Sequence, residues 1–442
     1  MAERVSGPEE SSDLAEQMRV CLAARGGEVS ARARAANLAQ AYVAADAAGR
    51  RAFLRTLASF DSDPQAVARA ADALGSATDP ESSAAAKVRL RRALEPPRLR
   101  LLTQFTTIPD GMKFLVDLRG ELLQLADGDG MLAALEADMK GLLANWFDVG
   151  FLELRRIDWS SPAALLEKLV DYEAVHRIRT WRDLKNRLDS DRRCYAFFHP
   201  RMPEEPLIFV EVALVQGLSD SVQRLLDQKA PVLDPKEADT AIFYSINNCQ
   251  RGLDGIAFGN FLIKRVVETL GGELRGLKHF ATLSPIPGFA RWLAEREHAA
   301  EDSLLQEAEA IALRKAAAVP PATHPTAALA LLMARRNWPR EPTLNATLEP
   351  ILVRLCARYL LSEGGRNPKR ALDPVGHFHL SNGARVERIN WLADTSAKGM
   401  AESAGLMVNY LYDPGKIEDH HEAYAGEGKR AAATAVRKLL KT

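Results

Sequence analysis

Apolar residues recur at intervals of three and four along the first third of the chain, from residue 12 to about residue 145. This spacing predicts helices, because it places the apolar side chains on one face. Asp63-Pro64 and Asp79-Pro80 are typical helix starts, each with a capping carboxylate before a proline in the first turn. We therefore predict an all-helical domain over residues 1–145. No catalytic motif stands out in it, which favours a scaffold, an oligomerisation surface or a partner-docking role.

Short apolar runs alternate with helical patterns from Trp146 onwards. Strands are predicted for GFLELRRIDW (150–159), CYAFFHP (194–200), LIFVEVALV (207–215), AIFYSI (241–246) and LKHFATL (277–283). Helices are predicted for AALLEKLVDYEAV (163–175) and GNFLIKRVVETL (259–270). The two prolines of RMPEEP (201–206) indicate a connection between strands. This succession predicts a mixed α/β domain over residues 146–442, and an α+β protein as a whole.

The periodicity becomes helical again from about residue 289 to residue 363, which indicates a helical insertion in the mixed domain. FHL (378–380) and ARVERINWL (384–392) are predicted to pair as a hairpin across Asn382-Gly383. A helix near 396–404 and a strand, LMVNYLYD (406–413), complete the pattern.

His377 and His379 flank a phenylalanine in the first strand of that expected hairpin. Alternate residues of a strand share a face, so both rings could point at one ligand. A metal pair of this kind needs a further carboxylate, histidine or cysteine, and none is obvious in the sequence. At this point, each histidine can be a metal ligand, a catalytic acid or an ordinary residue of a hairpin.

Composition narrows the function classes. Lys plus Arg and Asp plus Glu both number 58 in 442 residues, so no overall positive field favours nucleic acid. No apolar run reaches the roughly 18 residues of a membrane span, and the N-terminus lacks the apolar core of a secretory signal. The four cysteines are scattered without a Cys-x-x-Cys pair. A cytoplasmic protein with reduced thiols is the expectation.

The glycine-bearing loop GLDGIAFGN (252–260) lies between a predicted strand and a predicted helix. Glycines there let the backbone approach a ligand, and free N–H groups at a helix start suit a pyrophosphate. Neither a Walker loop nor a Rossmann fingerprint is present. The loop is more similar to the acyl-CoA loop of the GNAT acetyltransferase fold, although Gly252 stands where that pattern has Gln or Arg. A turn without a ligand explains it equally well.

SPIPGF (284–289) places a serine at the end of a predicted strand, before two prolines that stiffen the loop. From these residues alone a turn in which Ser284 caps the next helix is favoured. No Gly-x-Ser-x-Gly elbow is present, so an α/β-hydrolase assignment lacks its marker.

Four long blocks together resemble malonyl-CoA decarboxylases. They are HPRMPEEPLIFVEVAL, FYSINNCQRGLDGIAFGNFLIKRV, LKHFATLSPIPGF and HFHLSNGARVERINWLADTSAKGMAESAGLMVNYLY, in this order between about residues 195 and 412. The resemblance implies a helical oligomerisation domain joined to an acetyltransferase-like catalytic domain. It also implies conversion of malonyl-CoA to acetyl-CoA and CO₂ without a metal or organic cofactor, and a homo-oligomer, expected to be a tetramer.

The same resemblance implies the site residues. The catalytic serine falls at Ser284 and the catalytic histidine at His379, with His377 as a neighbour. The malonyl-CoA-binding loop maps to Asp254, Gly255, Ile256, Ala257, Phe258, Gly259 and Asn260. Ser245 and Tyr412 are expected beside the site.

Loss of CO₂ leaves electrons that must delocalise onto the thioester oxygen as an enolate, which fixed donors stabilise. The α-carbon must then be protonated, and a histidine titrating near neutrality suits that step. We expect His379 to donate this proton, and Ser284 to bond the departing carboxylate and to relay or accept a proton.

Two other functions are compatible with these motifs. An acyl-CoA N-acyltransferase on the same fold would require an added amine. A non-catalytic acyl-CoA-binding scaffold would bind the thioester without turnover.

Overall fold

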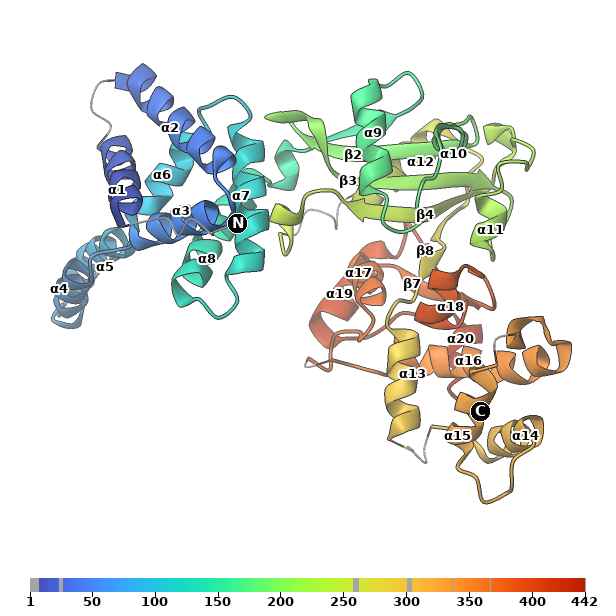
Figure 1. Cartoon of the computed structure of the whole chain (residues 1–442). Coiled ribbons are helices and arrows are strands. Elements are labelled where there is room, and N and C mark those ends of the chain that lie inside the picture. The colour runs from blue at the N-terminus through green and yellow to red at the C-terminus, as the bar shows by residue number, and fades with distance from the viewer. Residues whose placement is uncertain are drawn as a thin grey trace, which may run out of the picture. The chain divides into compact units, whose positions relative to one another are not determined.

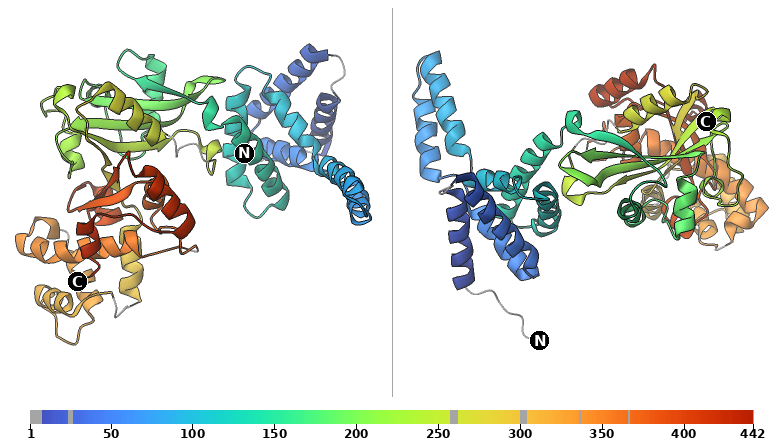
Figure 2. Two further views of the ribbon diagram at one scale, coloured as in Figure 1. Left: turned by 180° about the vertical axis from the view of Figure 1, so that it is seen from behind. Right: turned by 90° about the horizontal axis from the view of Figure 1, so that it is seen from above.

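The chain divides into two compact units. The computed structural model describes residues 8–23, 27–256, 262–299, 304–335, 337–365 and 367–441. The first unit is Met1–Glu153 with Phe197–Ile208 and Asn248–Phe258, and the second is Leu154–Ala196, Phe209–Asn247 and Gly259–Thr442. Figures 1 and 2 show helices at the blue end of the chain and a sheet with further helices beyond it. The predicted helical region followed by a mixed α/β region is confirmed.

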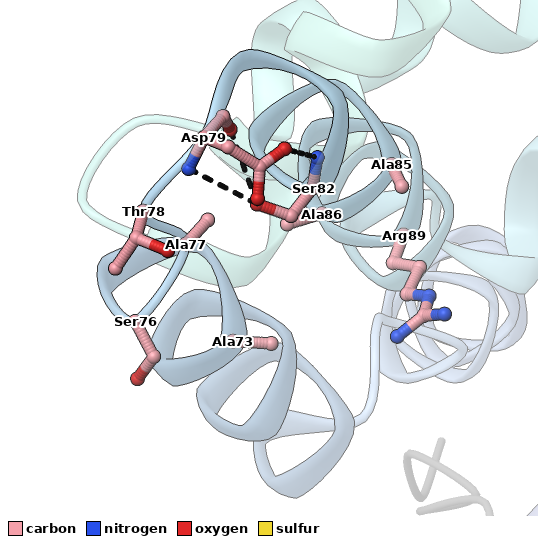
Figure 3. Close-up of a pocket in the computed structure, with 9 residues that line it drawn as sticks. All are labelled: Ala73, Ser76, Ala77, Thr78, Asp79, Ser82, Ala85, Ala86 and Arg89. Carbon is pink, nitrogen blue, oxygen red and sulfur yellow. Dashed lines mark hydrogen bonds between the residues drawn. The ribbon is translucent and has the colours of Figure 1, made fainter.

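The first unit is built from helices, and α4 and α5 begin at the two starts that the sequence predicts. They are α1 (Pro8–Leu22), α2 (Gly27–Ala44), α3 (Ala47–Ser59), α4 (Pro64–Gly75), α5 (Pro80–Leu94), α6 (Pro97–Phe105), α7 (Gly111–Leu125) and α8 (Gly130–Trp146). Asp63 accepts the N–H of Gln65 at the start of α4. Asp79 accepts the N–H of Ser82 at the start of α5 and also binds the Ser82 hydroxyl, as Figure 3 shows.

Helices α4 and α5 pair with each other and bury very little. Ala70 is the buried residue of α4, and Ala86 is that of α5. Val88 and Leu94 of α5 are 39% and 51% exposed. Figure 3 shows residues that line a pocket at their turn, where Asp79 and Ser82 are joined by hydrogen bonds. Apolar surface of this pair therefore stays open to a partner.

Most of the sheet lies in the second unit. Among the described residues it has eight strands. The strands are β1 (Glu153–Ile157), β2 (Arg192–His199), β3 (Met202–Val215), β4 (Thr240–Asn248), β5 (His279–Thr282), β6 (Ser284–Pro285), β7 (Arg385–Asn390) and β8 (Met407–Tyr412). Their order is β1-β2-β3-β4-β5-β8-β6, and β7 also pairs with β8. β4 and β5 are parallel, with Phe243 opposite Thr282. β8 runs antiparallel to β5, β6 and β7.

Helices complete the second unit. They are α9 (Ala163–Tyr172), α10 (Trp181–Arg187), α11 (Val222–Leu225), α12 (Leu262–Glu273), α13 (Phe289–His298), α14 (Glu307–Ala317), α15 (Pro325–Met333), α16 (Pro342–Leu361), α17 (Pro374–Ser381), α18 (Ala397–Ser403), α19 (Ile417–Glu427) and α20 (Thr434–Lys438). Helices α13 to α16 occupy the predicted helical stretch. Within the described ranges, no helix combines the length and apolar character needed to cross a membrane.

The sheet separates an apolar core from a polar face. Ile242, Ala281, Met407 and Leu411 pack with α11 in one cluster of buried apolar residues. Successive side chains of a strand point to opposite faces. Tyr410 and Tyr412 therefore lie on the face opposite Leu411.

The predicted hairpin across Asn382-Gly383 is wrong, because its first half is helix α17. Asp373 caps that helix by accepting the N–H of Gly376 at 2.7 Å, and Pro374 is its first residue. Gly383 has a φ of +80° and follows the helix end, where its N–H binds the carbonyl of Leu380. The Asn-Gly pair thus terminates a helix.

One smaller expectation also fails. The RMPEEP segment is not a separate connection, because β3 begins at Met202 and includes both prolines in its first five residues. The DHHEAY stretch (419–424) lies in α19, with Asp419 and Glu422 exposed and both histidines half-buried. Its histidines bind the carbonyls of Gly383 and Ser381.

Candidate active site

Ser284 lies where the β5 segment changes partner. The N–H of Leu283 binds the carbonyl of Phe243 on β4, whereas Ser284 pairs with Val408 on β8. The Ser284 side chain is buried on the polar face of the sheet, with Oγ 2.8 Å from Oγ1 of Thr282. The same Oγ lies 3.0 Å from Nε2 of His379. The structure therefore brings together the serine and the histidine expected from the sequence.

His379 comes from the last turn of α17 and is 2% exposed. Its second ring nitrogen, Nδ1, lies 2.8 Å from the hydroxyl of Tyr412. The ring also stacks on Tyr410, with centroids 4.6 Å apart and planes 26° apart. Two hydroxyls and one aromatic face thus fix the imidazole in position and orientation.

Burial lowers the pKa of His379 to about 3. Removing the ring from water penalises its charged form, and no carboxylate among the described residues offsets that cost. The imidazole is therefore neutral at physiological pH. The expectation of a histidine that titrates near neutrality is not met in this structure.

The four polar side chains Tyr412, His379, Ser284 and Thr282 form one continuous chain of hydrogen bonds. It ends where Thr282 Oγ1 accepts the backbone N–H of Tyr410. Either neutral tautomer of the ring satisfies both hydroxyl neighbours, since a hydroxyl can donate or accept. This arrangement can pass one proton between Ser284 and Tyr412 through the imidazole.

A buried carboxylate joins the segments that carry the serine and the histidine. Asp373 is fully buried and accepts the N–H groups of Gly376 and Val375 at the start of α17. It also accepts the N–H of Gly288, four residues after Ser284, and the hydroxyl of Tyr359. Burial raises the pKa of Asp373 to about 6, although these hydrogen bonds oppose the shift. Asp373 therefore fixes α17 against the loop that follows the serine.

Ser245 is buried on β4 but has other partners. Its hydroxyl donates to Glu173, with oxygen–oxygen distances of 2.7 and 2.9 Å. Asn247 donates to both Glu173 and Ser245. Burial raises the pKa of Glu173, while the hydrogen bonds it accepts act in the opposite direction. Among the described residues, these hydrogen bonds do not connect Ser245 to the Ser284–His379 chain.

The predicted malonyl-CoA loop is described in part. Asp254, Gly255 and Ile256 belong to the first unit. The other predicted members lie outside the described residues: Ala257, Phe258, Gly259 and Asn260. Gly255 has a φ of +76°, which glycine adopts without strain. The ammonium of Lys140 lies 3.1 Å from the place that a Cβ on Gly255 would take.

Gly252 has a packing role. A Cβ there would lie 1.7 Å from the carbonyl oxygen of Val116 on α7. Close approach of two backbones thus explains why a glycine stands where the acetyltransferase pattern has Gln or Arg.

His377 does not share the orientation of His379. Residues two apart on a helix point about 200° apart, and His377 Nδ1 binds the Tyr424 hydroxyl at 2.8 Å. Among the residues with described positions, no group of three or more His, Cys, Asp or Glu side chains could hold a metal ion.

Thr282, Tyr410, Tyr359 and Asp373 were missed by the sequence reasoning. Two signals could have found some of them. Asp373-Pro374 repeats the helix-start pattern of the N-terminal region, and the alternation in LMVNYLYD places Tyr410 on the same face as Tyr412.

Comparisons with known proteins agree across nearly the whole chain. The family model described as malonyl-CoA decarboxylase C-terminal domain matches residues 150–442, and the one described as malonyl-CoA decarboxylase N-terminal domain matches residues 60–147. The mitochondrial malonyl-CoA decarboxylase of Anser anser anser is 39% identical over 353 residues, covering 77% of this chain and 69% of the relative.

Two solved structures are also similar. The crystal structure of malonyl-CoA decarboxylase from Rhodopseudomonas palustris has a TM-score of 0.85 and 43% identity, covering 97% of this chain and 99% of that one. The enzyme from Agrobacterium vitis has a TM-score of 0.86 and 41% identity, with the same coverage.

Proposed function

The chain belongs to the malonyl-CoA decarboxylase family, and from this premise we propose how it converts malonyl-CoA to acetyl-CoA and CO₂. The proposal assigns the chemistry to Ser284, His379 and Tyr412, without a metal or organic cofactor. The single observation that carries it is the buried hydrogen-bond chain from Tyr412 through His379 to Ser284.

The bond between the α-carbon and the carboxylate breaks first, and CO₂ departs. The electron pair of that bond delocalises onto the thioester oxygen as an enolate. Backbone N–H donors beside the end of β4, near Ser245, stabilise this oxygen. Removing one donor of this kind typically costs roughly 2.7 to 4 kcal/mol of transition-state stabilisation.

Ser284 acts both before and after CO₂ leaves. Its hydroxyl bonds the carboxylate before it leaves, and then protonates the α-carbon to give acetyl-CoA. His379, which the sequence analysis expects to protonate the α-carbon directly, supplies this proton through Ser284, because its Nε2 lies 3.0 Å from Oγ. The proton on His379 Nε2 moves to Ser284 Oγ, and the Tyr412 hydroxyl proton moves to Nδ1. Ser284 ends as a hydroxyl, Tyr412 takes its proton back from Nδ1, and Nε2 takes one from water. The starting tautomer of His379 returns, and each turnover consumes one proton.

A neutral histidine suits this relay. The enolate is a far stronger base than imidazole, so the ring need not be an imidazolium to supply a proton. Burial also raises the pKa of Tyr412 well above its usual range, so a tyrosinate formed there regains its proton readily. A positioned proton donor is worth roughly 10²- to 10⁴-fold in rate.

The loop Asp254–Asn260 is proposed to bind the CoA part of the substrate. Support comes from its place between β4 and α12 and from the resemblance of its sequence. The positive φ of Gly255 fits a loop whose backbone faces a ligand.

The test is to incubate the purified protein with malonyl-CoA, a metal chelator and no amine, and to follow acetyl-CoA by chromatography. We expect rapid acetyl-CoA formation that falls at least about 10²-fold in Ser284→Ala and in His379→Gln. Intact malonyl-CoA after incubation with folded protein would overturn the reaction. Folded variants with near-full activity would overturn the residue assignment.

The same assay separates the two alternatives. Acetyl transfer that appears on adding an amine would favour the acyltransferase. Tight binding of malonyl-CoA without turnover would favour the scaffold.

We also propose that the protein is a homo-oligomer, a tetramer, assembled through the helical unit. Support comes from the exposed apolar side chains of the α4–α5 pair, such as Leu94. Light scattering coupled to size-exclusion chromatography tests it, and Leu94→Glu should lower the mass if this pair forms the interface. A cytoplasmic location is part of the proposal, and the four buried cysteine thiols fit a reducing compartment.

A further inference from the structure

We infer that Arg119, a residue of the helical unit, is a positioning residue for the substrate loop and so sets the affinity for the CoA thioester. The inference rests on the proposed role of the Asp254–Asn260 loop.

The Arg119 guanidinium reaches two carbonyls of the segment that leads into the loop. Nη1 donates to the Gly252 carbonyl at 2.6 Å, and Nη2 donates to the Asp254 carbonyl at 3.0 Å. All of these atoms belong to the first unit. The planar guanidinium holds both carbonyls in a fixed geometry, which a single ammonium cannot reproduce.

Arg119 is itself held firmly. Its side chain is 1% exposed. Nε and Nη2 donate to Glu136 of α8 at 3.1 and 2.6 Å. A buried cation of this kind is costly unless it is paired and hydrogen-bonded, and Arg119 uses a carboxylate on one side and the loop carbonyls on the other. The loop backbone is therefore part of what keeps this charge satisfied.

Helices α7 and α8 also contact the same segment, residues 252–255, at other points. Gly252 lies directly on the backbone of α7, where a Cβ would meet the Val116 carbonyl at 1.7 Å. Gly120, next to Arg119, faces the N–H of Gly252 from the helix side. One turn beyond Glu136, Lys140 lies against Gly255. Both α7 and α8 therefore fix the start of the loop, which the sequence alone assigns to the mixed domain.

The kinetic consequence follows from where the loop acts. The CoA part of the substrate is bound in the same way before and during decarboxylation, so its contacts are made equally in the ground and transition states. Loss of such uniform binding raises KM and leaves kcat nearly unchanged. Arg119→Lys, which keeps the charge and loses the fork, should therefore raise the KM for malonyl-CoA by roughly tenfold, with kcat within about twofold.

Arg98 offers a matched control. It is a buried arginine of the same unit, 3% exposed, that donates to Asp138 at 2.6 Å and to the Ala58 carbonyl at 2.7 Å. Neither these hydrogen bonds nor its ion pair with Asp61 involves the loop. Arg98→Lys should lower the melting temperature in the same way as Arg119→Lys, and leave KM at the wild-type value.

A second readout keeps the inference testable if Arg119→Lys folds poorly. Glu136→Gln leaves the guanidinium in place but weakens its hold, so KM should rise by less than in Arg119→Lys. Hydrogen exchange followed by mass spectrometry should show faster exchange for amides 251–256 in either variant, and unchanged exchange in Arg98→Lys.

The outcomes are distinct. If wild-type protein decarboxylates malonyl-CoA but the KM of folded Arg119→Lys and Glu136→Gln stays at the wild-type value, Arg119 only stabilises the fold and the inference is overturned. If KM rises equally in Arg98→Lys, the effect is one of general stability and the inference fails as well. Failure of the wild-type protein to turn over malonyl-CoA would instead overturn the proposed function.

Discussion

The hydroxyl of Tyr412 lies 2.8 Å from Nδ1 of His379, while Ser284 contacts the other ring nitrogen. Tyr410, two residues earlier on the same strand, stacks on the same ring. Its hydroxyl has no hydrogen-bond partner among the residues that the structure describes. One tyrosine therefore hydrogen-bonds a nitrogen of the histidine, and the other packs against the face of its ring.

The two tyrosines should therefore respond differently to the same substitution by phenylalanine. Tyr412→Phe removes the hydroxyl that resupplies the imidazole, so kcat should fall by about 10²-fold with KM little changed. Tyr410→Phe keeps the stacked ring and removes a buried hydroxyl that lacks a partner, so activity should persist and stability should not fall. Steady-state kinetics and thermal denaturation of both variants check this. Equal losses of kcat would contradict the role given to Tyr412.

Ser284 and His379 should behave as one unit. If both belong to a single proton relay, either loss breaks it, and the double variant Ser284→Ala/His379→Gln should be no slower than the slower single variant. Single-turnover measurements of acetyl-CoA formation on all three proteins provide the comparison. Multiplicative losses would mean that the two side chains act independently.

The buried imidazole predicts a pH dependence of stability. The pKa of His379 is about 3 in the folded protein and about 6.5 in an unfolded chain. Above pH 6.5 both states are neutral, and the group adds no slope. As the pH falls below 6.5 the unfolded state gains a proton that the folded state does not, so stability falls by about 1.4 kcal/mol per pH unit from this group.

His379→Gln should remove that slope. Urea unfolding of wild type and variant at pH 4.5, 5.5, 6.5 and 7.5 measures it, and the two curves should converge toward low pH. His176, whose burial lowers its pKa to about 4, leaves a similar slope in both proteins. Parallel curves would mean that the folded ring titrates near neutrality after all.

Gly288 should be coupled to Tyr359. A Cβ on Gly288 would lie 2.1 Å from the Tyr359 hydroxyl oxygen and 3.3 Å from the ring carbon that bears it. Gly288→Ala should therefore cost about 1 to 3 kcal/mol of stability by overpacking, and should lower activity because the loop follows Ser284. Removing the oxygen in Gly288→Ala/Tyr359→Phe should recover most of that stability. A double-mutant cycle from thermal or urea unfolding gives the coupling energy, and additive effects would argue against the clash.

Hydrophobic periodicity predicted the strands from Glu153 to Val215 and the helical N-terminal region. These features are local, and each can be recognised within one short stretch of chain. Ser284 and His379 were selected through a resemblance that spans four long blocks, and their side chains lie within hydrogen-bonding distance. Their catalytic roles stay a prediction.

The failures have two causes. Asn382-Gly383 favours a turn, but the cap-and-proline pair Asp373-Pro374, nine residues before Asn382, marks a helix start that the sequence analysis overlooked. The neutral state of His379 depends on burial by segments distant in the chain, as does the acceptor role of Asp373 toward Gly288. The hold of Arg119 on Gly252 joins residues 133 positions apart. Long-range contacts of this kind leave no signature in a window of ten residues.

Strand β8 determines whether the region around Ser284 and His379 tolerates insertions and deletions. It carries Val408 opposite Ser284, Tyr410 beneath the imidazole and Tyr412 at Nδ1. Because side chains alternate along a strand, inserting or deleting one residue between 408 and 412 would turn part of this set into the apolar core and break its alignment with the rest. The activity of all single-residue insertion and deletion variants would test this. Almost every variant within β8 should be inactive, whereas variants in the turn at Asp413–Lys416 should keep activity.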